Sequence, residues 1–284
     1  MAVVSEESIQ RGWDRLIDHF PFTGYLDHLH DGSIDVARTV VRYLPAGSRI
    51  LDFGAGPADK TALLAEMGYA CTAMDDLDDE WHRRGEARQL ILDFAAQMGV
   101  DFVLLDREGL PPTDQFDMVM LHSVLQHLHE SPRELLVELV ERIRPGGYLF
   151  ITTPNHVNLR KRLAVLRGKT IHAAFNLYYW YPGGWRGYVR EYTQGDLIDL
   201  ARALGLDLLE VRGVHHMLYR IPPRARSLYR ALTACAPSLR DTWLMVARKP
   251  VGWVPARDLS DEEFRRVTGL TSWAETHSAR TLPD

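Results

Sequence analysis

The chain has 284 residues, of which 46% are hydrophobic and 25% are charged, and its formal net charge at pH 7 is -5. A chain of this length and composition can bury a full core without cross-links and forms one or two globular domains. The acidic balance argues against a general nucleic-acid-binding protein, and no apolar run is long enough to predict a transmembrane segment. With two cysteines and no secretory signal, we expect a cytoplasmic enzyme.

The N-terminal part of the chain shows helical periodicity. Apolar residues recur at helical spacing from Ile9 to Phe20 and again from Ile34 to Leu44, and the segment FPFTGY separates the two runs. A proline and a glycine then end the pattern. We therefore predict that residues 1–45 form an N-terminal helical cap.

Short apolar runs alternate with helical stretches through the middle of the chain. Strands are predicted at 50–53, 69–74, 102–105, 116–121, 148–153, 206–211 and 243–247. Between them lie predicted helices, including one over about 81–98 and one that Thr193 caps and that runs to about Leu204. This α/β alternation predicts a Rossmann-like, doubly wound, mostly parallel seven-stranded sheet with helices on both faces.

Two segments, 155–190 and 214–241, do not follow the alternation of strands and helices. We expect them to form a lid above the sheet. The predicted organisation is therefore an N-terminal cap, a single α/β domain over 46–250 with these two insertions, and a C-terminal tail over 251–284.

The first predicted strand runs into the segment LDFGAGPAD. In an open parallel sheet, ligands bind beyond the carboxyl ends of the strands. Gly54 and Gly56 let the backbone approach a ligand closely and free the N–H groups at the start of the next helix. Asp75 follows Gly54 by 21 residues and ends the second predicted strand, where an acidic residue commonly bonds ribose hydroxyls. This spacing predicts a nucleoside-binding site.

The carboxylates near the glycines distinguish between possible nucleosides. A dinucleotide-binding loop has a third glycine where this sequence has Asp59, and a carboxylate there would repel a pyrophosphate. Asp52 adds a second negative charge directly before the glycines. Because these carboxylates suit a ligand with positive charge, such as an ammonium or a sulfonium, NAD is disfavoured and S-adenosylmethionine fits.

The segments ILDFGAGPADKT, AMDD, LLDREGLPPTDQFDMV, VLQHLHE, IRPGGYLFITTPN and VREYTQGDL occur in this order over more than half of the chain. With them, the stretch from 49 to 153 resembles class I S-adenosylmethionine-dependent methyltransferases, in the broad group that includes the ubiquinone-pathway O-methyltransferases. Ala58 departs mildly from the pattern, because the family commonly has a third glycine there.

The resemblance implies a set of cofactor contacts. Asp52, Gly54 and Gly56 would hold the methionine end of S-adenosylmethionine, and Asp75 would bond the ribose diol. Asp106 and the backbone of Arg107 would hold the adenine.

A base of near-neutral pKa assists methyl transfer to a hydroxyl, and histidine is the natural candidate. His122 ends the fourth predicted strand at the rim where the methyl group should lie, so we predict that it contacts the cofactor and is catalytic. His127 matches a histidine that recurs in the resembled family and is the second catalytic candidate. For each, the alternative is a hydrogen-bonded structural histidine. The spacing of His122, His127 and His129 lacks the i, i+4 pair of a helical metal site, so we predict no metal.

Acceptor contacts are predicted in the segment after the fifth strand. The candidates are Asn155, His156, Tyr179, Trp180, Tyr181, Trp185, Arg186 and Arg190. Aromatic rings suit a sugar or another flat acceptor, and the arginines suit a phosphate or a carboxylate. A solvated basic helix with structural tyrosines is the alternative. The insertion also resembles, more loosely, methyltransferases encoded with cell-surface glycan assembly, which implies a carbohydrate acceptor.

We therefore expect methyl transfer from S-adenosylmethionine to a small-molecule or glycan-like acceptor, at a hydroxyl, with S-adenosylhomocysteine as product. The basic residues at 160–169 suit a phosphorylated or lipid-linked acceptor, or alternatively contact anionic membrane lipid. Other hypotheses are N-methylation, phenol O-methylation in secondary metabolism, and a non-catalytic cofactor-binding module, against which Asp75 argues. A nucleic-acid acceptor is disfavoured because the chain is acidic and lacks an N-P-P-Y sequence after the fourth strand.

Overall fold

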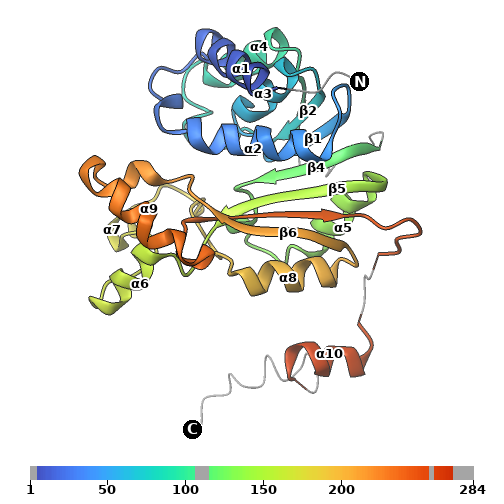
Figure 1. The fold of residues 1–284 in the computed structure, drawn as a ribbon, viewed down its shortest axis with the longest axis vertical. Coiled ribbons are helices and arrows are strands. Elements are labelled where there is room, and N and C mark those ends of the chain that lie inside the picture. Colours follow the sequence, from blue (N-terminus) through green and yellow to red (C-terminus); the bar gives the residue numbers. More distant parts are fainter. Residues whose placement is uncertain (1–4, 106–114, 256–258, 271–284) are drawn as a thin grey trace.

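A computed structural model describes residues 5–105, 115–255 and 259–270 of the chain. Its centre is a seven-stranded sheet with the order β3-β2-β1-β4-β5-β7-β6 (Figure 1). The strands are β1 (Arg49–Phe53), β2 (Ala70–Asp75), β3 (Asp101–Leu104), β4 (Phe116–His122), β5 (Ile143–Pro154), β6 (Asp207–Val214) and β7 (Thr242–Arg248). Only β7 runs antiparallel to its neighbours in this sheet. The predicted mostly parallel, seven-stranded Rossmann-like fold is therefore confirmed.

Helices cover both faces of the sheet. On one face pack α1 (Glu6–His19), α2 (His30–Tyr43), α3 (Asp59–Glu66) and α4 (Ala87–Gln97), and on the other α5 (Arg133–Glu141) and α8 (Gln194–Ala203). Successive strand residues point to opposite faces, so Ile50 packs with the first group of helices and Leu51 with the second. The core therefore consists of two apolar layers with the sheet between them.

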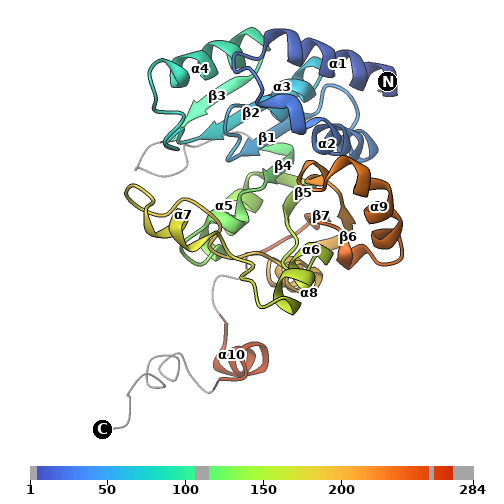
Figure 2. The ribbon, with the colours of Figure 1, turned by 90° about the vertical axis from the view of Figure 1, so that its left-hand side faces the viewer.

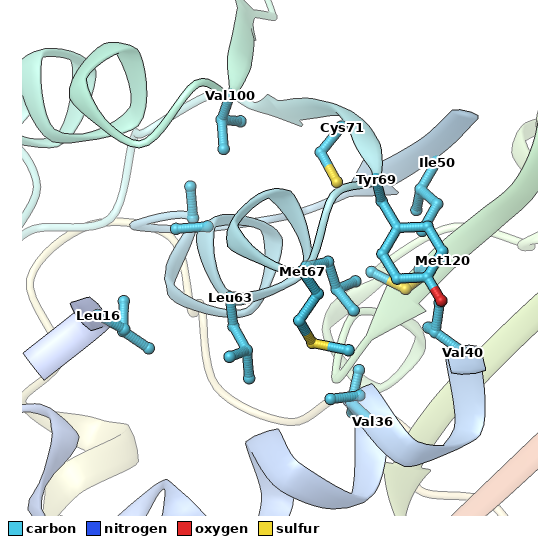
Figure 3. Close-up of a cluster of buried hydrophobic side chains, with 14 of the residues drawn as sticks. Leu16, Val36, Val40, Ile50, Leu63, Met67, Tyr69, Cys71, Val100 and Met120 are labelled. Carbon is cyan, nitrogen blue, oxygen red and sulfur yellow. The ribbon is translucent and has the colours of Figure 1, made fainter. Parts of the chain in front are cut away.

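The N-terminal helices belong to the first of these layers. Leu16 of α1 and Val40 of α2 are fully buried in the same cluster as Leu63 of α3 and Ile50 of β1 (Figure 3). The two helices thus share the core of the α/β domain and have no separate core of their own.

The helix predicted over 81–98 is shorter in the structure. The helix α4 begins at Ala87, and residues 79–86 form turns and bends. Gly85 has a φ of 55°, in the left-handed region that interrupts a right-handed helix. The polar segment after β2 is therefore a loop at the carboxyl end of the sheet.

The two insertions also lie at this end of the sheet (Figures 1 and 2). The first contains α6 (Leu159–Leu166) and α7 (Phe175–Tyr179), and the second contains α9 (Arg226–Ala234). Beyond β7 the chain forms one more helix, α10 (Asp261–Thr268). Among the described residues, no helix is long and apolar enough to cross a bilayer.

Candidate active site

The loop between β1 and α3 approaches its neighbours closely. Gly54 has a φ of 70°, and a Cβ on it would stand 2.5 Å from a methyl group of Val124, so no larger residue fits. Gly56 has a φ of 54°, and a Cβ there would meet no atom within 4 Å. The loop is thus packed against Val124, which follows β4, on one side and is open on the other. Ala58 also takes a left-handed φ, 58°, in the position where the resembled family commonly has glycine.

Asp75 lies at the end of β2, directly beside this loop. Its two carboxylate oxygens accept hydrogen bonds from the backbone N–H of Gly56 at 2.8 Å and of Leu77 at 2.7 Å. Burial raises the pKa of this carboxyl, and the two N–H donors partly oppose the rise. Because each carboxylate oxygen has more than one lone pair, the fixed side chain can still accept bonds from two hydroxyls.

A cavity of about 950 Å³ opens over the glycine loop. Its wall includes Gly54, Gly56 and Asp75, three of the predicted cofactor contacts, together with Tyr181, Trp185 and Arg186 of the first insertion. The loop after β2 contributes further carboxylates, from Asp76, Asp78, Asp79 and Glu80. The cavity therefore has glycines and carboxylates on the sheet side and aromatic rings on the insertion side.

Asp52 and Asp59 do not line this cavity. Asp52 is buried, accepts a hydrogen bond from the Thr61 hydroxyl at 2.7 Å, and leaves Oδ1 without a partner among the described residues. Burial raises the pKa of Asp52 to about 7. Asp59 pairs with Lys60 at 2.8 Å. Asp52 and Asp59, from which we predicted a positively charged ligand, thus lie beside the glycine loop and not in the cavity wall. The carboxylates of the wall come mainly from the loop after β2. The predicted adenine contacts, Asp106 and Arg107, lie outside the described residues.

His122 ends β4, as predicted, but it is not part of the cavity wall. Its Nδ1 lies 2.7 Å from the Thr152 hydroxyl, and its ring centre lies 5.9 Å from that of His216. Burial lowers the pKa of His122 well below its usual range, and the charge of Lys60 lowers it further. The imidazole is therefore neutral at physiological pH.

His127 and His129 hold the first insertion over the cavity. Nδ1 of His127 lies 2.8 Å from the carbonyl oxygen of Arg186, and Nε2 of His129 lies 2.7 Å from that of Trp185. A carbonyl oxygen only accepts, so each of these nitrogens carries its proton. In His127 this leaves Nε2 with the lone pair. Both histidines line the cavity, and the role of His129 was not predicted from the sequence.

Arg186 contacts the acidic loop. Its Nε donates to Asp79 at 2.6 Å, and its Nη2 lies 3.2 Å from a carboxylate oxygen of Asp76. We expected this arginine to face an anionic group of the acceptor, but its guanidinium is already paired with carboxylates. Together with the two histidines it joins residues 181–187 to the ends of β2 and β4.

The remaining predicted acceptor residues lie away from the cavity wall. Asn155 is buried, and its amide donates to the carbonyls of Ser238 and Arg240, a structural role. The exposed fractions of Tyr179 and Trp180 are 62% and 75%. The other two, His156 and Arg190, lie near Glu191 and Asp196 respectively.

One side chain of the cavity wall and one near the acidic residues were not predicted from the sequence. His82 lines the cavity and is 3% exposed, and neither ring nitrogen has a hydrogen-bond partner among the described residues. A buried imidazole without partners is costly, so a bound ligand is a natural source of them. Tyr25 of the N-terminal segment is close enough to Asp59, Asp75 and Asp79 for their charges, after burial, to raise its pKa well above the usual range. Neither residue has a sequence motif that could have identified it.

Acidic and histidine side chains gather here without forming a metal centre. No group of three or more His, Cys, Asp or Glu side chains among the described residues could hold a metal ion.

A glycine loop after β1, an acid at the end of β2 and this strand order define an α/β enzyme that binds a nucleoside cofactor at the carboxyl end of its sheet. The family described as "Methyltransferase domain" matches residues 28–211. Because this match covers more than half of the chain, the protein belongs to that family and is an S-adenosylmethionine-dependent methyltransferase.

Similar proteins are found by sequence and by structure. The Ubiquinone biosynthesis O-methyltransferase of Coxiella burnetii is 28% identical over 173 residues, which are 60% of this chain and 68% of the relative. The corresponding protein of Burkholderia thailandensis is 26% identical over 201 residues, covering 69% and 81%. The solved 1,6-didemethyltoxoflavin-N1-methyltransferase of B. thailandensis superposes with a TM-score of 0.51 at 19% identity, over 88% of this chain and 92% of that one. This last likeness is one of fold.

Proposed function

We propose that the enzyme transfers the methyl group of S-adenosylmethionine to a hydroxyl of a small-molecule or glycan-like acceptor bound in the cavity over Gly54 and Gly56. The observation that carries the proposal is the acidic wall beside the glycine loop. A sulfonium with an adjacent ammonium group is attracted by such a wall, whereas a pyrophosphate is repelled.

The cofactor would lie along the ends of β1 and β2. The open side of Gly56 would accommodate its methionine part, and the carboxylate of Asp75 would accept bonds from the ribose hydroxyls. The unpartnered ring of His82 would bond the adenosyl group. Asp52, in its ionised form beside the loop, would favour the ammonium group without touching it.

His127 is the better placed of the two predicted catalytic histidines. It lines the cavity, and its lone pair is on Nε2 because the Arg186 carbonyl fixes the proton on Nδ1. We assign to this nitrogen the proton released by the acceptor hydroxyl. His122 is the second candidate, since its low pKa keeps it neutral but it lies outside the cavity wall.

The rings of Tyr181 and Trp185 would hold the acceptor, because flat or sugar rings pack well against aromatic faces. Carboxylates crowd the rest of the wall, and Arg186 is already paired with them, so the acceptor part inside the cavity is neutral or cationic. A phosphate or lipid group on the acceptor would lie outside, over the basic insertions.

The names of the O-methylating relatives favour an oxygen acceptor over a nitrogen one. The free thiols of Cys71 and Cys235 agree with a cytoplasmic location.

A donor-binding titration followed by an acceptor screen tests the proposal. S-adenosylmethionine should bind the purified chain in calorimetry, and NAD should not. When S-adenosylmethionine carries a labelled methyl group, the label should be transferred to sugars. Transfer to phenols or to amines in the same screen would instead support phenol O-methylation or N-methylation. His127→Gln should lower kcat much more than donor affinity, and His122→Gln provides the comparison. NAD binding without donor binding would overturn the proposal, and donor binding without methylation of any acceptor would indicate a non-catalytic module.

A further inference from the structure

Positive charge is segregated in this acidic protein. The two insertions, 155–190 and 214–241, contain twelve Lys and Arg residues and one acidic residue, Asp241, although the whole chain has a net charge of -5. The remainder of the chain is therefore strongly acidic. Such an asymmetry marks a surface for a partner of opposite charge.

The structure brings the two insertions together. The side chain of Asn155 donates to the Ser238 and Arg240 carbonyls, and Arg162 donates to the Ser238 hydroxyl, which ties the first insertion to the second. The helices α6, α7 and α9 lie along one side of the molecule, at the carboxyl ends of the parallel strands (Figures 1 and 2). We call this surface the basic face and define it by α6, α7, α9 and the turns between them.

Large apolar side chains are exposed on the basic face. Leu166 of α6 is 81% exposed, Phe175 of α7 and Trp180 just after it are 69% and 75% exposed, and Leu228 of α9 is 65% exposed. Single exposed apolar residues are common, but several large aromatic and aliphatic side chains exposed on the same side of a molecule indicate an interaction surface.

Several cations of the basic face are not neutralised within the protein. Arg160, Arg167, Lys169 and Arg224 make no ion pair with any described carboxylate. The positive charges of Arg160 and Arg220 also help to lower the pKa of Lys161, after the larger effect of burial, so these cations are close to one another. Anionic groups can therefore bind them without displacing a carboxylate.

We propose that the basic face docks on the surface of a membrane that contains anionic phospholipids. Exposed Trp, Phe and Leu side chains insert at the boundary between headgroups and acyl chains, and Lys and Arg bind the phosphates. The acidic remainder of the molecule is repelled by the same surface, which fixes the orientation. A nucleic acid would stack on the rings but would leave Leu166 and Leu228 without a partner. Residues 181–186, which line the cavity, follow α7 directly, so docking would place the cavity near the lipid surface.

The test is co-sedimentation of the full chain with vesicles, which requires no methyl transfer and is therefore independent of the proposed function. The protein should sediment with vesicles of phosphatidylcholine and phosphatidylglycerol but not with phosphatidylcholine alone, and added salt should release it. Arg167→Gln and Lys169→Gln should each lower the partition coefficient about fivefold. Leu166→Asp and Trp180→Asp should each lower it at least about tenfold.

Matched controls lie at the opposite end of the sheet. Val251 is 86% exposed and follows β7, and Arg202 is an exposed cation on α8. Val251→Asp and Arg202→Gln should leave vesicle binding unchanged. Free glycerol phosphate should not compete with vesicles, because a soluble phosphate offers no apolar layer. Equal binding to both vesicle types, no binding to either, or loss of binding in the control variants would overturn the proposal, and binding to RNA in place of vesicles would assign the basic face to nucleic acid.

Discussion

Asp75 and Asp52 stand at the ends of neighbouring strands and have different roles. Asp75 is held by two backbone N–H groups and faces the cavity, whereas Asp52 is buried behind the loop with one oxygen unpaired. We propose that the first accepts bonds from a ligand and that the second acts through its charge when it is ionised. Each role leads to a different measurable effect.

Replacing Asp75 should weaken cofactor binding. Asp75→Ala removes the acceptor proposed for the ribose hydroxyls, and we expect a loss of about 1–3 kcal/mol in the binding of S-adenosylmethionine. Calorimetric titration measures it. Asp75→Asn, which keeps one oxygen, should lose less affinity for S-adenosylmethionine. The control is Asp207→Ala, at an exposed carboxylate paired with Arg248, which should leave this affinity unchanged. Unchanged affinity in Asp75→Ala would contradict the ribose assignment.

Replacing Asp52 should change how stability depends on pH. Its folded-state pKa, about 7, lies above the unfolded value near 4, so the native state holds the proton more tightly. This stabilisation is complete below about pH 4 and is lost as the pH rises through about 7. Relative to Asp52→Asn, the wild-type free energy of unfolding should fall by about 2–4 kcal/mol between about pH 4 and pH 8. Denaturation at several pH values measures this difference, and parallel curves for the two proteins would show that Asp52 ionises normally.

At the scale of elements, the first insertion is held over the cavity by groups from two strands. Arg186 pairs with the loop after β2, and His127 and His129 bond its backbone from the segment after β4. These contacts close the cavity on the side away from the sheet.

Arg186→Ala should loosen residues 181–187. The ion pairs are partly exposed and therefore worth about 1 kcal/mol together, which corresponds to an increase of about fivefold in the opening equilibrium. Hydrogen exchange of the backbone amides in this segment measures the opening. Arg190→Ala, which removes a pair with Asp196 outside the cavity, is the control and should leave these amides unaffected. Equal exchange in wild type and Arg186→Ala would show that Arg186 does not hold the segment.

Local signals predicted most of the elements because their causes are local. Thr193 forms a capping box with Asp196, and the helix begins and ends within a residue of the prediction. The glycine loop and Asp75 were likewise found, since strand ends of one sheet meet at one edge. The contacts of the insertion were not predictable. Arg186 and Asp76 are 110 residues apart, and no periodicity in the sequence brings them together. Because such long-range contacts leave no local signal, the sequence also could not show that His127 lines the cavity whereas His122 does not.

At the scale of the whole molecule, the N-terminal helices are part of the domain core. Leu16 is fully buried against residues of α3, whereas the next residue, Ile17, is 51% exposed. The pair gives a matched comparison within one helical turn.

Leu16→Ala should destabilise the entire protein by about 2–5 kcal/mol, because it leaves a cavity in the shared core. Ile17→Ala should change the free energy of unfolding by less than about 0.5 kcal/mol. Thermal unfolding followed by circular dichroism should show one transition in both variants. Two separate transitions for Leu16→Ala would mean that the cap unfolds independently of the sheet.

The acidic wall has a consequence for turnover. Loss of the methyl group converts a sulfonium into an uncharged thioether, so the spent molecule has one positive charge fewer than the fresh one. A charge several ångströms from a carboxylate at a protein surface contributes about 1 kcal/mol or more. We therefore expect the acidic wall to bind S-adenosylmethionine more strongly than S-adenosylhomocysteine. Because salt screens this difference, product inhibition should become stronger relative to substrate binding as the ionic strength rises.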